Sequence, residues 1–161
     1  MVDVAVFIGS ISDKEKMMPC VEILKKLGIN FEFHVTSAHR TPERTKEMVR
    51  DLEKIGCKVF ICGAGLAAHL AGAVAAMTIR PVIGVPICAS PLGGMDALLS
   101  TVQMPPGYPV ATVALDKVGA KNAGYLAAQI LAISNPILGE KLNSYREEMR
   151  RQVQESDKDL Q

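Results

Sequence analysis

The chain has 161 residues, enough for one domain whose core folds without disulfide or metal staples. Hydrophobic residues make up 48% and charged residues 22% of the sequence, a composition typical of globular proteins. A formal net charge of +1 gives no sign of the basic surface that a nucleic-acid or anionic-membrane partner requires.

The four cysteines form no C-x-x-C pair and show no His/Cys ligand spacing. Neither a zinc site nor a disulfide framework is therefore indicated, and reduced thiols in the cytoplasm are expected. The first residues, Met-Val-Asp-Val-Ala-Val-Phe, lack a basic region and carry Asp3 inside their apolar run. They predict a strand and not a signal peptide.

Apolar strands, glycine-rich or polar turns, and helices alternate along the chain. Ser12 and Asp13 offer N-cap chemistry to the first helix, Gly28 ends it, and Pro42 suits the first helical position of the second. In chain order, strands are predicted over Val4–Ile8, Phe31–Val35, 58–62, 81–85 and 110–114. Helices are predicted over 12–27, 41–56, 67–78, Met95–Val102, 118–133 and 136–153.

The strands are rich in Val and Ile without polar alternation, which is typical of a parallel sheet buried on both faces. Strand–helix alternation with short connections predicts an α/β fold, a three-layer doubly wound parallel sheet of the flavodoxin-like or Rossmann-like kind. Residues 1–161 are expected to form a single domain, with a core over 1–133 and an extended C-terminal helix and tail over 134–161. Ligands of such folds bind at the carboxyl ends of the strands.

Residues 59–79 form an uncharged stretch long enough to span a bilayer. The stretch opens like a strand, breaks at 63–65 and carries His69, so a buried strand–turn–helix is predicted and no membrane partner is expected.

Two predicted helices are too apolar for the surface of a monomer. Residues 67–79 and 123–133 contain few polar side chains, and a helix that is apolar all round is buried. A homo-oligomer is therefore expected. The last helix differs because its apolar residues form one stripe, which predicts packing by one face on its own domain or on a neighbour: Leu138, Leu142, Tyr145, Met149 and Val153.

Three loops at the predicted carboxyl edge carry chemistry. The first is Gly9-Ser10-Ile11-Ser12-Asp13, whose glycine, hydroxyls and helix N-terminus suit a phosphate, although a simple capped helix start fits equally well. The second is 37–42, Ser-Ala-His-Arg-Thr-Pro. An imidazole titrates near neutrality and a guanidinium forks onto phosphate or carboxylate, so His39 and Arg40 favour function over a solvated loop.

The third loop is 63–70, Gly-Ala-Gly-Leu-Ala-Ala-His-Leu, whose small residues let the backbone approach a ligand. His69 lies on an apolar helix, where it either contacts the ligand or is a satisfied core group. No Walker loop, dinucleotide-binding glycine motif, nucleophile elbow or metal cluster is present, so no cofactor or metal is predicted. From the residues alone, the chain binds a phosphate-bearing small molecule and uses a His general acid/base.

The sequence resembles the carboxyaminoimidazole ribonucleotide mutases of purine biosynthesis over about residues 4–133. Six motifs carry the resemblance in the same order: G-S-x-S-D (9–13), S-A-H-R-T-P (37–42), G-A-G-x-A-A-H-L (63–70), P-V-I-G-V-P (81–86), V-Q-M-P-x-G-x-P-V-A-T-V (102–113) and N-A-x-x-L-A-A-x-I-L (122–131). The resemblance implies that a carbamate on the substrate loses carbon dioxide, which ring carbon four then attacks. His39 would protonate the departing nitrogen and then remove the proton from carbon four, without metal, biotin or ATP.

The resemblance also assigns binding roles. Asp13 would hold the ribose hydroxyls, Ser10 and Arg40 the phosphate, and the walls around the imidazole and its carboxyl group would include Ser37 and His69. The predicted substrate-binding positions are Gly9, Ser10, Ser12, Asp13, Ser37, Ala38, Arg40, Gly65, Leu66, Ala67 and His69. The family implies a homo-octamer about a four-fold axis, and an ATP-dependent synthetase that supplies the carbamate.

Three positions depart from the family pattern: Leu66 where glycine is expected, Ala71 where proline is expected and Ala97 where serine is usual. Three alternatives stay open. The chain could carboxylate aminoimidazole ribonucleotide directly with free carbon dioxide, or be a paralogue acting on another heteroaromatic nucleotide through Cys88. It could also be a non-catalytic nucleotide-binding or sensory module, although the intact His39–Arg40 pair argues against this.

Overall fold

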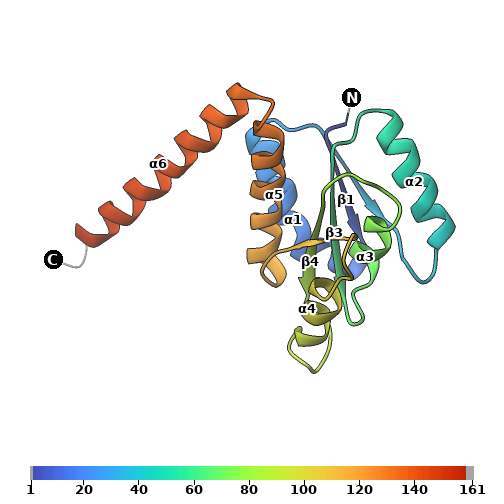
Figure 1. The fold of residues 1–161 in the computed structure, drawn as a ribbon. Helices are drawn as coiled ribbons and strands as arrows, with labels where there is room; N and C mark the ends of the chain where they lie inside the picture. Colours follow the sequence, from blue (N-terminus) through green and yellow to red (C-terminus); the bar gives the residue numbers. More distant parts are fainter. Residues whose placement is uncertain (1, 159–161) are drawn as a thin grey trace.

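The computed structural model describes residues 2–158 as a parallel five-stranded sheet flanked by helices on both faces (Figure 1). The strand order is β2-β1-β3-β4-β5. In this order the connections that leave β1 and β3 run to opposite sides, and a ligand crevice forms between them at the carboxyl ends of the two strands. The predicted α/β class, the doubly wound sheet and the C-terminal helix are confirmed. The strands are β1 (Val4–Ile8), β2 (Phe31–Val35), β3 (Val59–Gly65), β4 (Val82–Ile87) and β5 (Ala111–Thr112).

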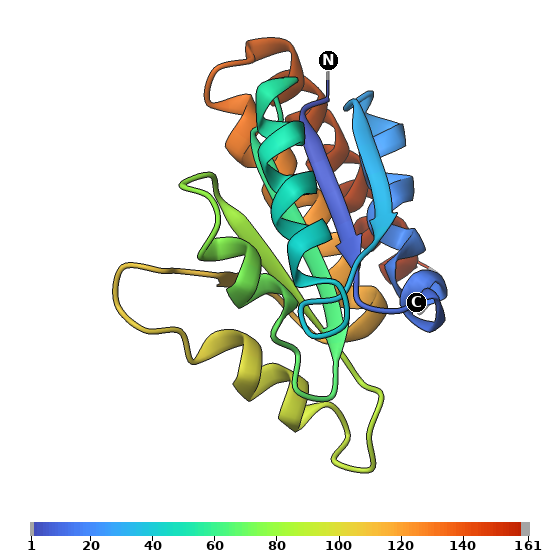
Figure 2. The ribbon, with the colours of Figure 1, turned by 90° about the vertical axis from the view of Figure 1, so that its right-hand side faces the viewer.

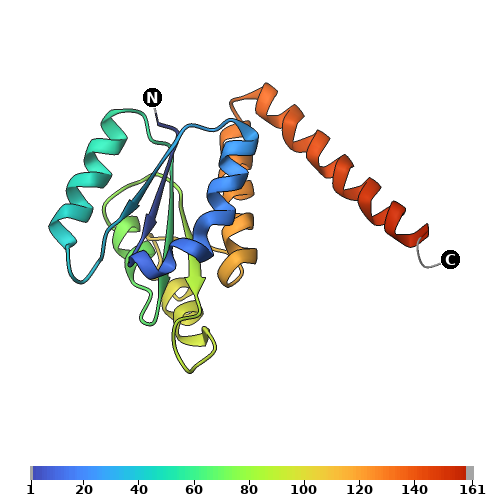
Figure 3. The same cartoon turned by 180° about the vertical axis from the view of Figure 1, so that it is seen from behind.

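The helices alternate with these strands, as the pattern predicted, and they form two layers, one on each face of the sheet. Helices α1 and α5 cover one face, whereas α2 and α3 lie on the other (Figures 1 and 3). A short 3-10 turn, Ile11–Asp13, precedes the first helix. The helices are α1 (Lys14–Leu27), α2 (Pro42–Lys54), α3 (Leu70–Ala75), α4 (Met95–Val102), α5 (Asp116–Ala132) and α6 (Pro136–Lys158).

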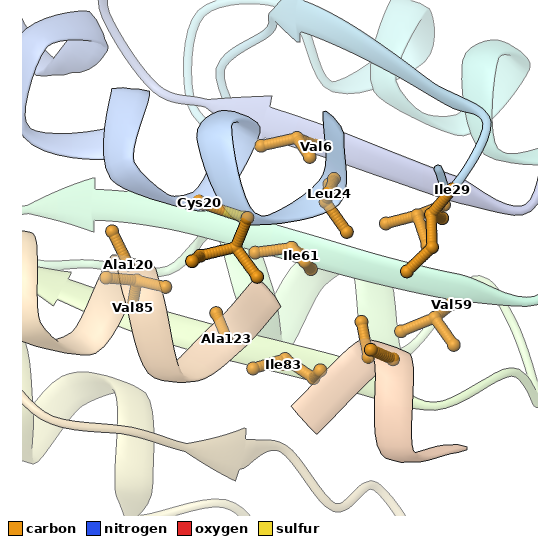
Figure 4. Packing of buried hydrophobic residues seen from close by; sticks show 14 of the residues in the cluster. Val6, Cys20, Leu24, Ile29, Val59, Ile61, Ile83, Val85, Ala120 and Ala123 are labelled. Carbon is orange, nitrogen blue, oxygen red and sulfur yellow. The ribbon is translucent and has the colours of Figure 1, made fainter. Parts of the chain in front are cut away.

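The face under α1 and α5 holds the larger aliphatic core (Figure 4). Alternate residues of each central strand point into it, including Val6, Ile61 and Ile83. Small residues along α5 let that helix approach α1 closely, because an added Cβ at Gly124 would lie 3.0 Å from Cβ of Ile23. The side of α5 that faces α1 is thus buried by its own chain, so its small apolar residues do not by themselves require another subunit, although Ile133 just beyond the helix is 87% exposed.

The third strand and helix differ from their predicted bounds. The glycines at 63 and 65 lie inside β3 and do not break it. Glycine is needed at both positions because neighbouring atoms leave no room for a Cβ. An added Cβ at Gly63 would meet Sδ of Met17 at 2.7 Å. Helix α3 is shorter than the predicted 67–78. Residues 67–69 lie before it, and the Ala68 N–H donates to the Ser100 hydroxyl of α4. The strand–turn–helix prediction for 59–79 holds, and no helix in the described part of the chain is long and apolar enough to cross a membrane.

The first helix begins differently from the prediction. Asp13 occupies the predicted N-cap position of α1, but its side chain makes no capping hydrogen bond. Ser10 caps the preceding 3-10 turn instead, because its hydroxyl accepts the Ser12 N–H. Gly28 ends the helix in the left-handed region at φ 72°, as predicted. Helix α6 runs away from the body of the molecule (Figure 1). Its stripe therefore packs only in part: Leu138 is buried, whereas Val153 is 72% exposed.

Candidate active site

The carboxyl ends of β1, β2 and β3 point the same way (Figure 2). Residues of the loops that leave these strands line a cleft of about 570 Å³. The cleft gathers His39 and every predicted substrate-binding residue. It also takes in three residues that the sequence reading missed: Ala64, Leu70 and Ala89. Small apolar side chains give no chemical signal in a sequence, and Ala89 follows β4, a strand to which no site residue was assigned.

Two imidazoles meet inside this cleft. Nε2 of His39 lies 2.8 Å from Nδ1 of His69, with the ring planes 75° apart. A hydrogen bond at this distance needs one N–H and one lone pair, so the tautomers of the two rings are coupled. Both side chains are exposed, and His69 stands at the N-cap position of α3, just before the helix in which it was predicted. The pair can exchange a proton between rings and can present one to a bound molecule.

Hydroxyl and backbone hydrogen bonds fix the loop that carries His39. The Ser37 carbonyl accepts the Thr41 N–H at 3.0 Å, and the Ser37 hydroxyl accepts the Arg40 N–H at 3.2 Å. Beneath it, the buried hydroxyls of Thr36 and Thr45 are 2.8 Å apart. The loop is therefore held in shape before any ligand arrives, and Pro42 begins α2 directly after it.

The loop after β1 forms the opposite wall and is rich in donors. The Ser12 hydroxyl donates to the Ser10 hydroxyl at 2.9 Å, and Nη2 of Arg40 donates to the Gly9 carbonyl at 3.2 Å. Arg40 thus reaches across from the second loop to the first. Two hydroxyls and a guanidinium on one wall suit a phosphate group.

Asp13 lies at the base of this wall and is only 7% exposed. Burial raises the pKa of its carboxyl above the ordinary 3.8, although hydrogen bonds from the Ser10 backbone and the Ser12 hydroxyl, and the charge of Lys16, pull the other way. A buried acceptor of this kind suits a hydroxyl donor such as those of a ribose. In the described part of the chain, no three His, Cys, Asp or Glu side chains gather as metal ligands would.

The loop after β3 forms the third wall and depends on α4. Leu66 adopts φ 56°, a left-handed conformation that costs a leucine energy, and its side chain is 56% exposed. The Ser100 hydroxyl accepts the Ala68 N–H at 2.9 Å, which ties the turn to α4. Ser100 was not predicted, because it lies far from the loop in sequence and within a helix.

A protein-family model for AIR carboxylase matches residues 3–152. The chain belongs to the AIR carboxylase family. Its relatives include N5-carboxyaminoimidazole ribonucleotide mutase from Pyrococcus abyssi, 52% identical over 94% of this chain and 86% of that protein. The mutase from Saccharolobus solfataricus is 53% identical, covering 95% and 96%, and that from Bacillus subtilis is 49% identical, covering 98% and 97%.

Solved structures agree with this assignment. The structure of Treponema denticola PurE superposes with a TM-score of 0.91 at 28% identity, covering 100% of this chain and 99% of that one.

The three departures from the family pattern fall in different places. Leu66 lines the cleft, whereas Ala71 and Ala97 are buried in the core beneath it, each at most 2% exposed. Cys88 does not line the cleft and is half-buried beside it. Of these four positions, only Leu66 can meet a substrate of this AIR carboxylase family member directly.

Proposed function

We propose that this chain is an N5-carboxyaminoimidazole ribonucleotide mutase of purine biosynthesis, an isomerase that moves a carboxyl group from the exocyclic nitrogen to ring carbon four. The observation that carries the proposal is the His39–His69 pair, which faces a wall of phosphate-binding donors across one cleft. The mutase names of relatives about half identical to this chain support the reaction class.

His39 acts first as an acid and then as a base. It gives a proton to the exocyclic nitrogen as the bond from that nitrogen to the carboxyl carbon breaks, which releases carbon dioxide inside the cleft. Ring carbon four attacks this carbon dioxide, and His39 then removes the proton from carbon four. His39 thus regains the proton that it donated in the first step, so the two steps together are an isomerisation. His69, at 2.8 Å, accepts or supplies the hydrogen bond that sets the tautomer of His39.

The remaining cleft residues hold the ribonucleotide. Ser10, Ser12 and Arg40 bind the phosphate, whereas the buried carboxylate of Asp13 accepts hydrogen bonds from the ribose hydroxyls. The base lies between the histidines and the third wall. Gly65, Ala67 and Ala38 leave room for the ring and its carboxyl group, and Leu66 covers one side.

Direct carboxylation of aminoimidazole ribonucleotide with free carbon dioxide would use the same cleft and is the less favoured alternative. The name of the matching family model leaves room for it, whereas the relatives' names do not. A paralogue that works through Cys88 is disfavoured, because that thiol does not line the cleft.

We also propose that the chain works as a homo-octamer in the cytoplasm, supplied with the carbamate by a separate ATP-dependent synthetase. Exposed apolar side chains, among them Ile79 at 99% and Ile133 at 87%, support association with other copies. The four free thiols fit a reducing compartment.

The deciding assay starts from aminoimidazole ribonucleotide, with and without the carbamate-forming synthetase, at low bicarbonate. Product that forms only when the carbamate is supplied identifies a mutase. Product at a comparable rate from bicarbonate alone would identify a direct carboxylase. In a parallel reaction the carbon-carboxylated ribonucleotide is incubated with the protein and its loss is followed by ultraviolet absorbance. Inactivity in both directions would refute the proposal.

A further inference from the structure

Behind the cleft, an ion pair between Lys16 and Asp116 forms hydrogen bonds with both the backbone N–H and the backbone carbonyl of Cys88. The Nζ atom of Lys16, on α1, lies 3.1 Å from Oδ1 and 3.1 Å from Oδ2 of Asp116, the first residue of α5. Oδ1 of Asp116 accepts the Cys88 N–H at 2.9 Å, and Lys16 donates to the Cys88 carbonyl. Cys88 is therefore gripped at its N–H by the anion and at its carbonyl by the cation.

Cys88 is the point at which β4 ends and the segment 88–94 begins. The next residue, Ala89, lines the cleft and packs against Gly65, where an added Cβ would lie 2.7 Å from Cβ of Ala89. The far end of the segment closes on the same place, because a Cβ at Gly94 would lie 2.2 Å from Cδ2 of Leu115 and 3.2 Å from Cβ of Cys88. A shift of Cys88 would therefore be felt in the cleft wall at Ala89.

The backbone of Asp116 supports a specific role for its side chain. Its φ of 54° lies in the left-handed region, where a residue with a Cβ is strained and glycine is not. Strain of this kind persists only where the surroundings hold it. Here the carboxylate holds it through Lys16 and the Cys88 N–H, and a negative charge at the first residue of α5 is favoured by the helix dipole.

We propose that Lys16 and Asp116 are positioning residues that clamp the segment 88–94 and thereby set the Ala89 wall of the cleft. The claim about turnover rests on the proposed function, whereas the claim about the segment does not. In the proposed reaction this wall helps to keep carbon dioxide beside ring carbon four until it is attacked. A loosened wall would let carbon dioxide escape and leave aminoimidazole ribonucleotide behind.

The experiment compares the full-length wild type with Lys16→Met, Asp116→Gly and Asp116→Asn. Asp116→Gly removes the carboxylate and relieves the strained φ, so it tests the clamp without leaving a strained backbone behind. Asp116→Asn keeps an Oδ1 acceptor and tolerates the left-handed region, so it should behave between wild type and Asp116→Gly. Lys16→Arg, which keeps a cation at this position, should retain most of the wild-type behaviour.

Lys117→Met is the matched control. It removes a second ion pair between the same two helices, Lys117 to Glu15 at 3.3 Å, which touches no backbone of the segment 88–94. This pair is more exposed than the clamp, at 59% and 87% against 33% and 33% for the two side chains. The control therefore tests whether the loss of a charge on α5 beside α1 is enough to produce the effect, without disturbing the backbone of Cys88.

Two readouts decide the proposal. Amide hydrogen exchange across 88–94 should rise at least about tenfold in Lys16→Met and Asp116→Gly, with β1 and β3 unchanged, because a held segment exchanges only by local opening. In turnover, kcat should fall by about tenfold in both variants, and KM should stay within about twofold in Asp116→Gly, which leaves the charge of Lys16 beside Asp13 in place. The fraction of turnovers that release aminoimidazole ribonucleotide should rise.

Exchange that stays within about twofold of wild type in both variants, or that rises equally in Lys117→Met, overturns the clamp. Faster exchange with unchanged kcat and unchanged partition in an active enzyme overturns its role in the cleft. If the wild type does not turn over while the variants still expose 88–94, the proposed reaction fails and the clamp stands.

Discussion

The two faces of the sheet are packed differently, and the site divides along the same line. The α1–α5 face joins two long helices through close contacts of small residues and buries the larger set of aliphatic side chains. The α2–α3 face is thinner, because α3 has only six residues and α2 buries only three.

In the proposed reaction, this difference separates the residues that anchor the substrate from those that carry out the chemistry. Ser10 and Asp13 lead into α1 on the well-packed face, whereas His39 lies in the loop before α2 and His69 directly precedes α3 on the thinner one. A phosphate and ribose anchor gains from rigidity, since ordering it on binding costs affinity. Exposed imidazoles that carry and orient a proton in the proposed reaction gain from room to move. Substitutions on the two faces should therefore damage different steps.

The largest effect is expected from His39→Asn on the thinner face. This change should lower kcat by about 10²–10⁴-fold, the usual contribution of a positioned acid/base, while substrate still binds. The measurement is steady-state turnover together with calorimetric binding of the carbon-carboxylated product. His69→Asn serves as the companion variant and should cost less, because it removes a hydrogen-bond partner of the acid and not the acid itself. A rate for His39→Asn within about threefold of wild type would sink the assigned mechanism.

Asp13→Asn on the anchoring side should weaken binding instead, by about tenfold or more, because a hydrogen bond to a charged acceptor becomes one to a neutral amide. It should also stabilise the free protein at pH 7. The pKa of Asp13 in the folded state lies above the ordinary 3.8 of the unfolded chain. Between these two pKa values the folded state binds more protons than the unfolded chain. Stability is then lost as the pH rises through that window, and the loss persists at neutral pH.

Calorimetric melting at pH 4 and pH 7 tests this sign. The gain in melting temperature from Asp13→Asn should be larger at pH 7 than at pH 4. Glu15→Gln, an exposed carboxylate in the first turn of the same helix, is the control and should change neither the melting temperature nor binding. A variant that melts lower than wild type at pH 7 would show that the carboxylate stabilises the fold.

The sequence was enough to predict the layers, the order of elements and the three loops of the cleft. Parallel strands place their carboxyl ends on one edge, so polar and glycine-rich residues after successive strands had to converge. The bounds of β3 and α3 could not be predicted in the same way. Residues 67–69 include two alanines, which favour helix, yet they lie outside α3, and the Ala68 N–H donates to the Ser100 hydroxyl of α4, a contact between segments far apart in the sequence.

Contacts between distant segments were also beyond the sequence. Nothing in the spacing of Lys16, Cys88 and Asp116 announces that the three meet, and the conformation of Asp116 is one that a sequence suggests only where it shows glycine. The pairing of His39 with His69 belongs to the same class, since it depends on how two loops turn after leaving their strands.

Gly124→Ala tests the packing of the α1–α5 face. The added Cβ would lie 3.0 Å from Cβ and 3.1 Å from Cγ2 of Ile23, and 3.2 Å from the Cys20 carbonyl. Neither a branched β-carbon nor a helix carbonyl can easily move, so overpacking of about 1–3 kcal/mol should exceed the helix-propensity gain of about 1 kcal/mol. Urea unfolding should show a lower free energy of unfolding, with kcat unchanged.

Gly139→Ala on α6 is the matched control for that substitution. An added Cβ there meets nothing within 4 Å, so only the propensity gain of about 0.5–1 kcal/mol applies and the protein should become slightly more stable. If both variants were stabilised equally, the two helices would not be as closely packed as the contacts at Gly124 indicate.

The smallest effect is expected from Leu66→Gly on the cleft wall. Glycine removes a left-handed strain of about 1–2 kcal/mol but adds about 0.5–1 kcal/mol of unfolded-state entropy, so the net gain in stability should lie between about 0 and 1.5 kcal/mol. Leu66→Ala separates the two roles of the residue, because it keeps the strain and loses the side chain. If the side chain closes the cleft, both variants should raise KM by a similar small factor, and only Leu66→Gly should gain stability. A loss of stability in both variants would mean that the leucine side chain packs on the cleft in a way that its 56% exposure conceals.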